Sequence, residues 1–434
     1  MYKCSLLFFI LCFSLFVPGQ FFAQSRITLD SCIVRALDAN YSIKIIRHQE
    51  SQAENNVNYA PFLPTVSASA GQKQTVSDSK VTNNGEDRFM NHTRSDVLSA
   101  GVALNWRLFD GLEMFMTHAR YKEMLAIGEL KTKMAVENLI VQVSSYYYDV
   151  IRQQSKVDAA RHSLSLSEAR YAEARDKYVL GVLSGLEARQ AKLDLNADSS
   201  NYIKEKKLLR SAYISLNTIM NADLQQQAYV EDSIVLRAPL QFKGLLEDML
   251  HWNTTLLIGR RDQKVSELDM KIARAALFPK LDFGTGYNYS RTKAPESTTS
   301  LNRTNGPYWG FSMSVDIFNR LENRRKIKNA RLDMEIADLS YQEAELQMKA
   351  DLAQLYNTYE NNLQMVSFEQ ESALVAFDNL DAALEKYKLR ELAGIEFREF
   401  QRSYIDAVDR EVSAIYQTKI SELSLLLISG QILK

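Results

Sequence analysis

Two long stretches of the chain carry apolar residues at the spacing of an α-helix. They run over residues 112–180 and 321–389, and neither contains proline. At 1.5 Å per residue, roughly 70 residues make a helix about 100 Å long. Steps of four and three residues, typical of coiled coils, relate Leu352, Tyr356, Tyr359, Leu363 and Val366. The pattern therefore predicts two long helices that pack as coiled coils.

Before each long stretch, apolar and polar residues alternate with the period of two that a β-strand requires. Each half is predicted to hold two strands of about ten residues. Polar loops, at roughly residues 77–94 and 291–306, are expected to join the strands. The length, the alternation and the aromatic content match transmembrane β-strands. A soluble hairpin with one buried face would show the same alternation.

A shorter helix is predicted before each pair of strands, over residues 28–62 and 244–276, with Thr28 as a suitable N-cap. Pro64 and Pro279 follow these helices. Because proline pushes the residue before it into extended geometry, these two prolines are predicted to mark the transition from helix to strand.

One phrase of the sequence occurs twice, 209 residues apart. Tyr178 corresponds to Tyr387, and each is followed by leucine and then by Gly-Leu-Glu or Gly-Ile-Glu. The same offset pairs Leu216 with Leu425. A fixed offset without net insertion predicts two structurally equivalent halves.

At each copy of this phrase the long helix is predicted to reverse into a shorter one, at residues 186–220 and 395–428. Tyr178 and Tyr387 are expected to pack under the turns rather than to act as latches. Because Arg390 stands where the first half has Gly181, the second turn is predicted to differ in shape. The turns themselves are placed at Gly181, Gly185 and Gly394.

The first 23 residues have the pattern of a signal peptide, with Lys3 before an apolar run at residues 5–17. An N-terminal membrane anchor is the alternative, although the run is short for a bilayer. Cleavage would leave Cys32 as the single cysteine. A buried position on the first helix is expected for it, rather than lipid attachment.

The remaining chain is predicted to form a first repeat at residues 24–220, a linker at 221–243 and a second repeat at 244–434. One short strand is expected in the linker near residues 229–235.

The composition argues against several functions. Lys and Arg number 52 and Asp and Glu 53, so no basic surplus is available for nucleic acid. The five histidines are scattered without the spacing of metal ligands. No glycine loop for phosphates is present. We therefore expect no catalytic site, no metal and no cofactor.

Four strands cannot close a membrane barrel, and an open sheet edge in lipid would leave backbone groups unpaired. Several copies must then share one barrel. Three copies supply twelve strands and enclose a pore, whereas two would give a tight barrel with little interior space.

The duplicated order of elements, the proline-ended helices and the repeated reversals resemble the TolC-like outer-membrane efflux proteins over residues 28–428. The resemblance implies a mainly α fold, with helical hairpins forming an α-barrel tunnel and four strands per chain entering a homotrimeric twelve-stranded β-barrel. It places the chain in the outer membrane of a Gram-negative bacterium, in contact with lipid and with a large periplasmic portion.

The resemblance also implies a passive exit duct of a tripartite efflux or type I secretion system, with a periplasmic adaptor and an inner-membrane transporter as partners. The alternative is a secreted or surface coiled-coil scaffold or adhesin without transport activity.

In this family the reversals lie at the periplasmic tip, where acidic residues after the second turn form a selectivity ring. The matching residues are Glu396 and Glu399, with Glu187 in the first half and Gln190 in place of a fourth acid. Such a ring would favour cations. Acidic residues are also common at the solvated start of any helix, where the dipole favours them.

Arg398 and Arg189 flank the same turns. They are candidates for ion pairs that hold neighbouring helices closed, although an arginine at such a position is more often an ordinary surface residue.

Overall fold

The computed structural model describes residues 27–83, 86–227, 230, 233–294 and 300–433. The predicted signal peptide lies outside them. The chain divides into two compact units. The helix unit comprises Met1–Lys44, Ala135–Met249 and Ala350–Lys434, and the strand unit comprises Ile45–Met134 and Leu250–Lys349.

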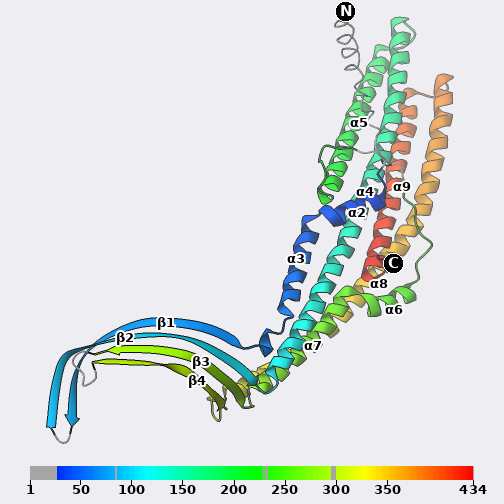
Figure 1. The fold of residues 1–434 in the computed structure, drawn as a ribbon. Helices are drawn as coiled ribbons and strands as arrows, with labels where there is room; N and C mark the ends of the chain where they lie inside the picture. Colours follow the sequence, from blue (N-terminus) through cyan, green and yellow to red (C-terminus); the bar gives the residue numbers. More distant parts are fainter. Residues whose placement is uncertain (1–26, 84–85, 228–229, 231–232, 295–299, 434) are drawn as a thin grey trace, which may run out of the picture. The chain divides into compact units, whose positions relative to one another are not determined.

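The elements of the first half appear in Figure 1, where all but the short 3₁₀ turn carry labels. They are α2 (Leu29–Ala39), α3 (Tyr41–Asn56), the 3₁₀ turn η1 (Ala60–Phe62), β1 (Thr65–Asn83), β2 (Glu86–Phe109), α4 (Glu113–Val179) and α5 (Gly185–Ile219). Those of the second half are α6 (Phe242–Trp252), α7 (Thr254–Ala275), β3 (Lys280–Lys293), β4 (Leu301–Ser314), α8 (Glu322–Lys388) and α9 (Gly394–Ile428). The predicted order of elements is confirmed, and α4 and α8 begin and end one residue inside their predicted bounds.

The predicted single helix before each pair of strands is wrong, because an asparagine divides it in both halves. Asn40 separates α2 from α3, and Asn253 separates α6 from α7. The Asn40 side chain accepts from the Ser42 N–H at 2.8 Å, and that of Asn253 accepts from the Leu256 N–H at 3.1 Å. Asparagine competes for backbone hydrogen bonds in this way and favours the start of a new helix.

The repeat extends to the backbone. Within the described residues, left-handed positions recur 209 residues apart, and a buried residue often has a buried equivalent. The left-handed pairs are Gly111 and Arg320, Leu112 and Leu321, Gly181 and Arg390, and Asn221 and Gly430. Fully buried equivalents include Val143 and Leu352, each 0% exposed.

Cys32 lies in the core of the helix unit, as expected, with 1% of its surface exposed. It packs in one cluster with Tyr147 and Leu216. Burial raises the pKa of its thiol to about 11.

The linker is held by a buried ion pair on α9. Lys419 contacts Glu422 at 2.8 Å and also donates to the Val235 carbonyl at 2.9 Å. Glu422, which is 0% exposed, accepts from the Arg237 N–H at 3.2 Å. The predicted short strand at residues 229–235 falls partly outside the described residues, and its described members are not in a strand.

In the strand unit the four strands form one antiparallel sheet in the order β1-β2-β3-β4. The predicted loops at 77–94 and 291–306 are too long, because the strands continue through much of both. Cross-strand backbone bonds do not depend on side-chain polarity, so the ladder extends into polar sequence. The β1–β2 ladder contains one irregularity, between Ser77 and Ser79.

The register gives the sheet two different faces. On the apolar face, Trp106 lies opposite Phe283, and Phe283 lies opposite Phe311. This face also carries Val66, Ala68, Ala70, Ala100, Val102, Leu104, Thr285, Tyr287, Tyr289, Pro307, Trp309 and Met313. The small-residue face carries Ser67, Ser69, Gly71, Ser99, Gly101, Ala103, Gly284, Gly286, Gly306, Gly310 and Ser312.

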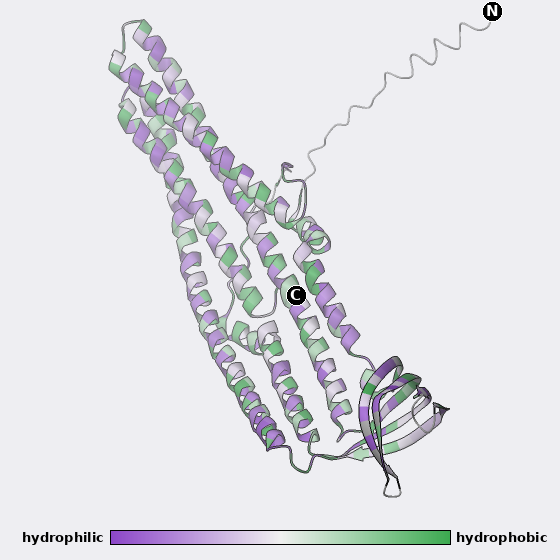
Figure 2. Ribbon diagram, turned by 90° about the vertical axis from the view of Figure 1, so that its left-hand side faces the viewer, coloured by the Kyte–Doolittle hydropathy of each residue, from purple (hydrophilic) through white to green (hydrophobic). Residues whose placement is uncertain are grey.

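Apolar and polar residues are interspersed along the helices (Figure 2). No helix in the described part of the chain is long and apolar enough to cross a membrane.

Candidate functional site

The first reversal, between α4 and α5, is a Schellman turn centred on Gly181. The Gly181 N–H donates to the Tyr178 carbonyl at 3.0 Å, and the Val182 N–H donates to that of Lys177 at 2.9 Å. Gly181 has a φ of 73°, a left-handed conformation that glycine adopts without a Cβ clash.

The second reversal has the same geometry, so the prediction of a different shape is wrong. The Arg390 N–H donates to the Tyr387 carbonyl at 3.0 Å, and the Glu391 N–H donates to that of Lys386 at 2.9 Å. Arg390 has a φ of 65°. The same hydrogen bonds close both turns, and they hold Arg390 in a conformation that a non-glycine residue adopts only at some cost.

The two tyrosines before the turns are placed differently. Tyr387 stacks on Phe397, with 5.2 Å between ring centroids, and burial raises its pKa. Tyr178 is 53% exposed and lies over the start of α5, where a Cβ added to Gly185 would meet its ring at 3.2 Å. At Gly394 the corresponding contact with Tyr387 is 3.9 Å.

Glu187 and Glu396 occupy equivalent positions in the first turn of their helices. Glu187 accepts from the Ser184 N–H at 3.2 Å, and Ser184 in return accepts from the Glu187 N–H at 3.2 Å. Glu396 accepts from the Ala393 N–H at 3.1 Å. Both carboxylates therefore cap a helix start while they stay exposed to solvent.

Glu399 is also exposed, one turn further along α9. Its equivalent, Gln190, donates to Asp194 at 3.0 Å. In the first half, Gln190 thus orients the Asp194 carboxylate. In the second half, the equivalent Glu399 presents its own side chain to solvent.

Arg398 points into the interior of the helix unit. Its guanidinium donates to both carboxylate oxygens of Asp198 on α5, at 2.6 and 2.7 Å. The Asp198 side chain is 5% exposed and that of Arg398 18%. Burial opposes the charge on Arg398, yet the hydrogen bonds and the negative charge of Asp198 raise its pKa above the ordinary arginine value.

Gln401, one turn beyond Arg398, links the same pair to α4. It is 0% exposed, and its amide donates to the Ser163 hydroxyl at 2.7 Å and to that of Ser167 at 3.0 Å. Ser167 in turn donates to Asp198. Three helices therefore meet in one buried network of hydrogen bonds.

A second buried ion pair lies closer to the turns. Arg170 of α4 pairs with Asp194 of α5, and their side chains are 5% and 11% exposed. Arg170 also donates to the carbonyl of Gly394, the first residue of α9, at 3.3 Å. We call Ser163, Ser167, Arg170, Asp194, Asp198, Arg398 and Gln401 the tip network.

The tip network belongs to one half of the repeat. Arg189 is the equivalent of Arg398, and Ala407 is the equivalent of Asp198. Ala407 is 2% exposed, so the second half has a packed methyl group where the first has a carboxylate. Arg189 is exposed on α5.

Of the residues singled out in the sequence, the structure brings only Arg398 into the tip network. The sequence pattern did not single out Asp194 and Asp198 on α5 or Arg170 on α4. The signal was present: Ser163, Ser167 and Arg170 step by four and three residues, as apolar seam residues do. Polar residues at seam spacing on two neighbouring helices indicate a buried network.

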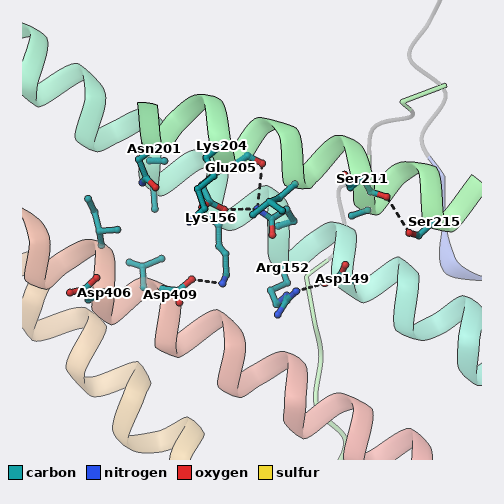
Figure 3. A pocket seen from close by; sticks show the side chains of 17 residues that line it. Asp149, Arg152, Lys156, Asn201, Lys204, Glu205, Ser211, Ser215, Asp406 and Asp409 are labelled. Atoms are coloured by element: carbon teal, nitrogen blue, oxygen red, sulfur yellow. Dashed lines mark hydrogen bonds and ion pairs between the residues drawn. The ribbon is translucent and has the colours of Figure 1, made fainter. Parts of the chain in front are cut away.

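A polar cleft of about 540 Å³ lies further along α4, α5 and α9 (Figure 3). Its basic residues each contact a carboxylate of the same chain: Arg152 pairs with Asp149, Lys156 with Asp409 and Lys204 with Glu205. This pairing is typical of a polar helix seam rather than of a ligand site. No group of three or more residues able to hold a metal occurs in the described part of the chain.

Pro64 and Pro279 stand directly before β1 and β3. Near the start of β3 in the strand unit, Arg107 forms an ion pair with Asp282, to which it donates at 3.0 Å across the β2–β3 ladder.

Comparison with known proteins shows which chains this one resembles. The family model described as outer membrane efflux protein matches residues 33–222 and 245–431. SilC of Salmonella typhimurium, described as a probable outer membrane lipoprotein, is 22% identical over 422 residues, which cover 95% of this chain and 87% of SilC.

OpmQ of Pseudomonas aeruginosa, described as a pyoverdine export outer membrane protein, is 24% identical over 400 residues, covering 88% of this chain and 81% of OpmQ. The crystal structure of the CmeC outer membrane channel of Campylobacter jejuni has a TM-score of 0.75 at 16% identity. That match covers 93% of this chain and 85% of CmeC, and it shows that the fold is shared.

Proposed function

Because the chain belongs to the outer membrane efflux protein family, we propose that three copies share one twelve-stranded barrel and that their paired turns form a gated, cation-selective mouth. The chain is an outer-membrane channel of a Gram-negative bacterium, the exit duct of a tripartite efflux system with a large periplasmic portion. Members of the family are trimeric channels that work with adaptors and inner-membrane transporters.

The sheet supports the shared barrel. Among the described residues, its edge strands, β1 and β4, each have a strand partner on one side only. In lipid those free edges must pair, because no water is present to satisfy their backbone groups. The apolar face suits contact with lipid, and the small and polar residues of the other face suit the water-filled interior of a channel.

The tip network supports a gate. It ties the start of α9 to α4 and α5 through Arg398, Gln401 and the Gly394 carbonyl. A buried, bidentate arginine–carboxylate pair fixes geometry better than a surface pair, because its two bonds are directional and shielded from solvent. Opening the mouth by moving α9 would have to break it.

The same network explains why the exposed acids would set selectivity. The positive charges of Arg398 and Arg170 are neutralised by ion pairs with Asp198 and Asp194. Glu396 and Glu399, both exposed, then contribute negative charge that these arginines do not neutralise. In a trimer, with Glu187 of each copy, they would crowd negative charge around one narrow opening and favour cations.

Because members of the family work with adaptors and transporters, we propose two partners for this chain, a periplasmic adaptor and an inner-membrane transporter, which deliver the substrate to the mouth. Because OpmQ is described as a pyoverdine export protein, pyoverdine is one substrate to test in a deletion strain.

The bidentate Arg398–Asp198 pair is the observation that carries the gate. The trimer is tested by membrane fractionation and native mass spectrometry. A heat-modifiable, SDS-resistant trimer in the outer-membrane fraction is expected, and recovery as a soluble monomer would instead favour a secreted scaffold or adhesin.

A further inference from the structure

The apolar face of the sheet becomes basic within two residues at the end far from the helices. Tyr289 lies opposite Ala100 and Asn305, and it belongs to the last largely apolar row. In the next row of the same face, Arg291 lies opposite Leu98 and Arg303. Lys293 follows one row further on. We call Arg291, Lys293 and Arg303 the basic row.

The direction of the strands places the basic row on the extracellular side. β1 and β3 start directly after Pro64 and Pro279, on the side of the helices. From Leu281 to Arg291 the strand advances about 33 Å at roughly 3.3 Å per residue. With the usual tilt of about 40°, this rise is about 25 Å along the membrane normal, the height of the apolar band of an outer-membrane barrel. Arg291 and Arg303 therefore lie at its outer boundary.

The two arginines of the basic row have no carboxylate opposite them in the part of the sheet that the structure describes. Arg291 and Arg303 are directly paired across β3 and β4, where like charges repel. No described carboxylate forms an ion pair with either of them or with Lys293. Asp96 lies opposite Lys293 across β2 and β3, but it is paired with Arg94 on its own strand, at 3.3 Å.

We propose that the basic row binds the phosphate groups of a phosphorylated glycolipid of the lipid A type in the outer leaflet. Guanidinium groups match phosphate with two parallel hydrogen bonds, and two adjacent arginines provide two such faces. The acyl chains of the same lipid would lie along the apolar face, beside Tyr287 and Trp309. A phosphate between Arg291 and Arg303 also removes their mutual repulsion.

This assignment rests on the sheet facing lipid and is independent of the gate. In the test, the purified full-length channel in detergent is titrated with bis-phosphorylated lipid A and followed by native mass spectrometry. The double variant Arg291→Gln/Arg303→Gln is expected to bind at least about tenfold more weakly, whereas Arg291→Lys/Arg303→Lys keeps most of the affinity. Dephosphorylated lipid A should bind the unmodified channel weakly.

Lys73 supplies the matched control. It is paired with Val97, whose other partner is Thr292, so it lies near the basic row but on the opposite face. Lys73→Gln should bind lipid A like the unmodified channel.

Equal binding of lipid A by the double glutamine variant would overturn the assignment, and so would equal affinity for dephosphorylated lipid A. Displacement of lipid A by millimolar inorganic phosphate would show a free-anion site instead. The comparison of the two lipids uses the unmodified channel, so it stays decisive if a variant fails to form the SDS-resistant oligomer. A channel without a gate would still show this binding.

Discussion

Arg398 and Asp198, which lie 200 residues apart in the sequence, are joined by two hydrogen bonds of 2.6 and 2.7 Å. The pair connects the start of α9 in the second half with the middle of α5 in the first. The equivalent pair is absent from the repeat, since Ala407 stands in the place of Asp198. Two halves with the same turn geometry thus differ in the side chains that link them.

The glutamates at the turns are expected to set ion selectivity. Glu396→Gln with Glu399→Gln removes two carboxylates per copy and should reduce the preference for cations in planar bilayers, because the ring loses its uncompensated charge. Block by divalent ions should weaken as well. Glu345→Gln is the control, since Glu345 pairs with Lys349 in the strand unit. Selectivity equal to that of the unmodified channel would contradict the assignment of these glutamates to the mouth.

The first turn is expected to require glycine. Gly181→Ala should lower the free energy of unfolding by about 1 kcal/mol, because the left-handed conformation is unfavourable for a residue with a Cβ. Gly244→Ala is the matched control: it lies in α6 with open space around it, and alanine favours the helix. Thermal unfolding of the detergent-solubilised protein measures both. Equal stability of Gly181→Ala and the unmodified protein would contradict the turn geometry.

The buried pair on α9 is expected to matter more than a surface pair. Glu422→Ala leaves Lys419 buried without its carboxylate partner and should cost about 3–5 kcal/mol. Glu385→Ala, which breaks an exposed pair with Lys388, should cost at most about 0.5 kcal/mol. Urea unfolding of both variants makes the comparison. Similar losses for the two would show that the linker is not held by this pair.

Cys32 is expected to be inert in the folded protein. Its pKa of about 11 lies above the ordinary thiol value, so the reactive thiolate is rare at pH 8, and the side chain is also buried. Iodoacetamide should therefore label the native protein slowly and the urea-unfolded protein quickly. Rapid labelling of the native protein, or a lipid mass attached to Cys32, would contradict its place in the core.

Much of the fold could be predicted because the spacing of apolar residues along a long helix is visible in the sequence itself. The bounds of α4 and α8 depend on proline-free helical spacing, and the turns depend on a repeated phrase. The breaks at Asn40 and Asn253 were missed because one asparagine hardly disturbs a helical pattern. The long strands were missed because pairing between β1 and β2, not polarity, decides where they end.

The site was less predictable for the same reason. Glu187 and Glu396 follow from the repeat, whereas Asp198 becomes important only when α5 packs beside α9. The shape of the second turn was also mispredicted: hydrogen bonds to Tyr387 and Lys386 hold Arg390 where a glycine is usual. Residue identity alone does not show which backbone conformations tertiary contacts will support.

Single-channel conductance of the double variant Asp198→Asn/Arg398→Gln tests the gate most directly. The variant removes both charges together, so no uncompensated buried charge remains to unfold the tip. Arg189→Gln, which changes the repeat equivalent of Arg398, is its control. We predict a conductance severalfold above that of the unmodified trimer for the double variant and an unchanged value for the control. Unmodified conductance in a correctly assembled double variant would contradict it.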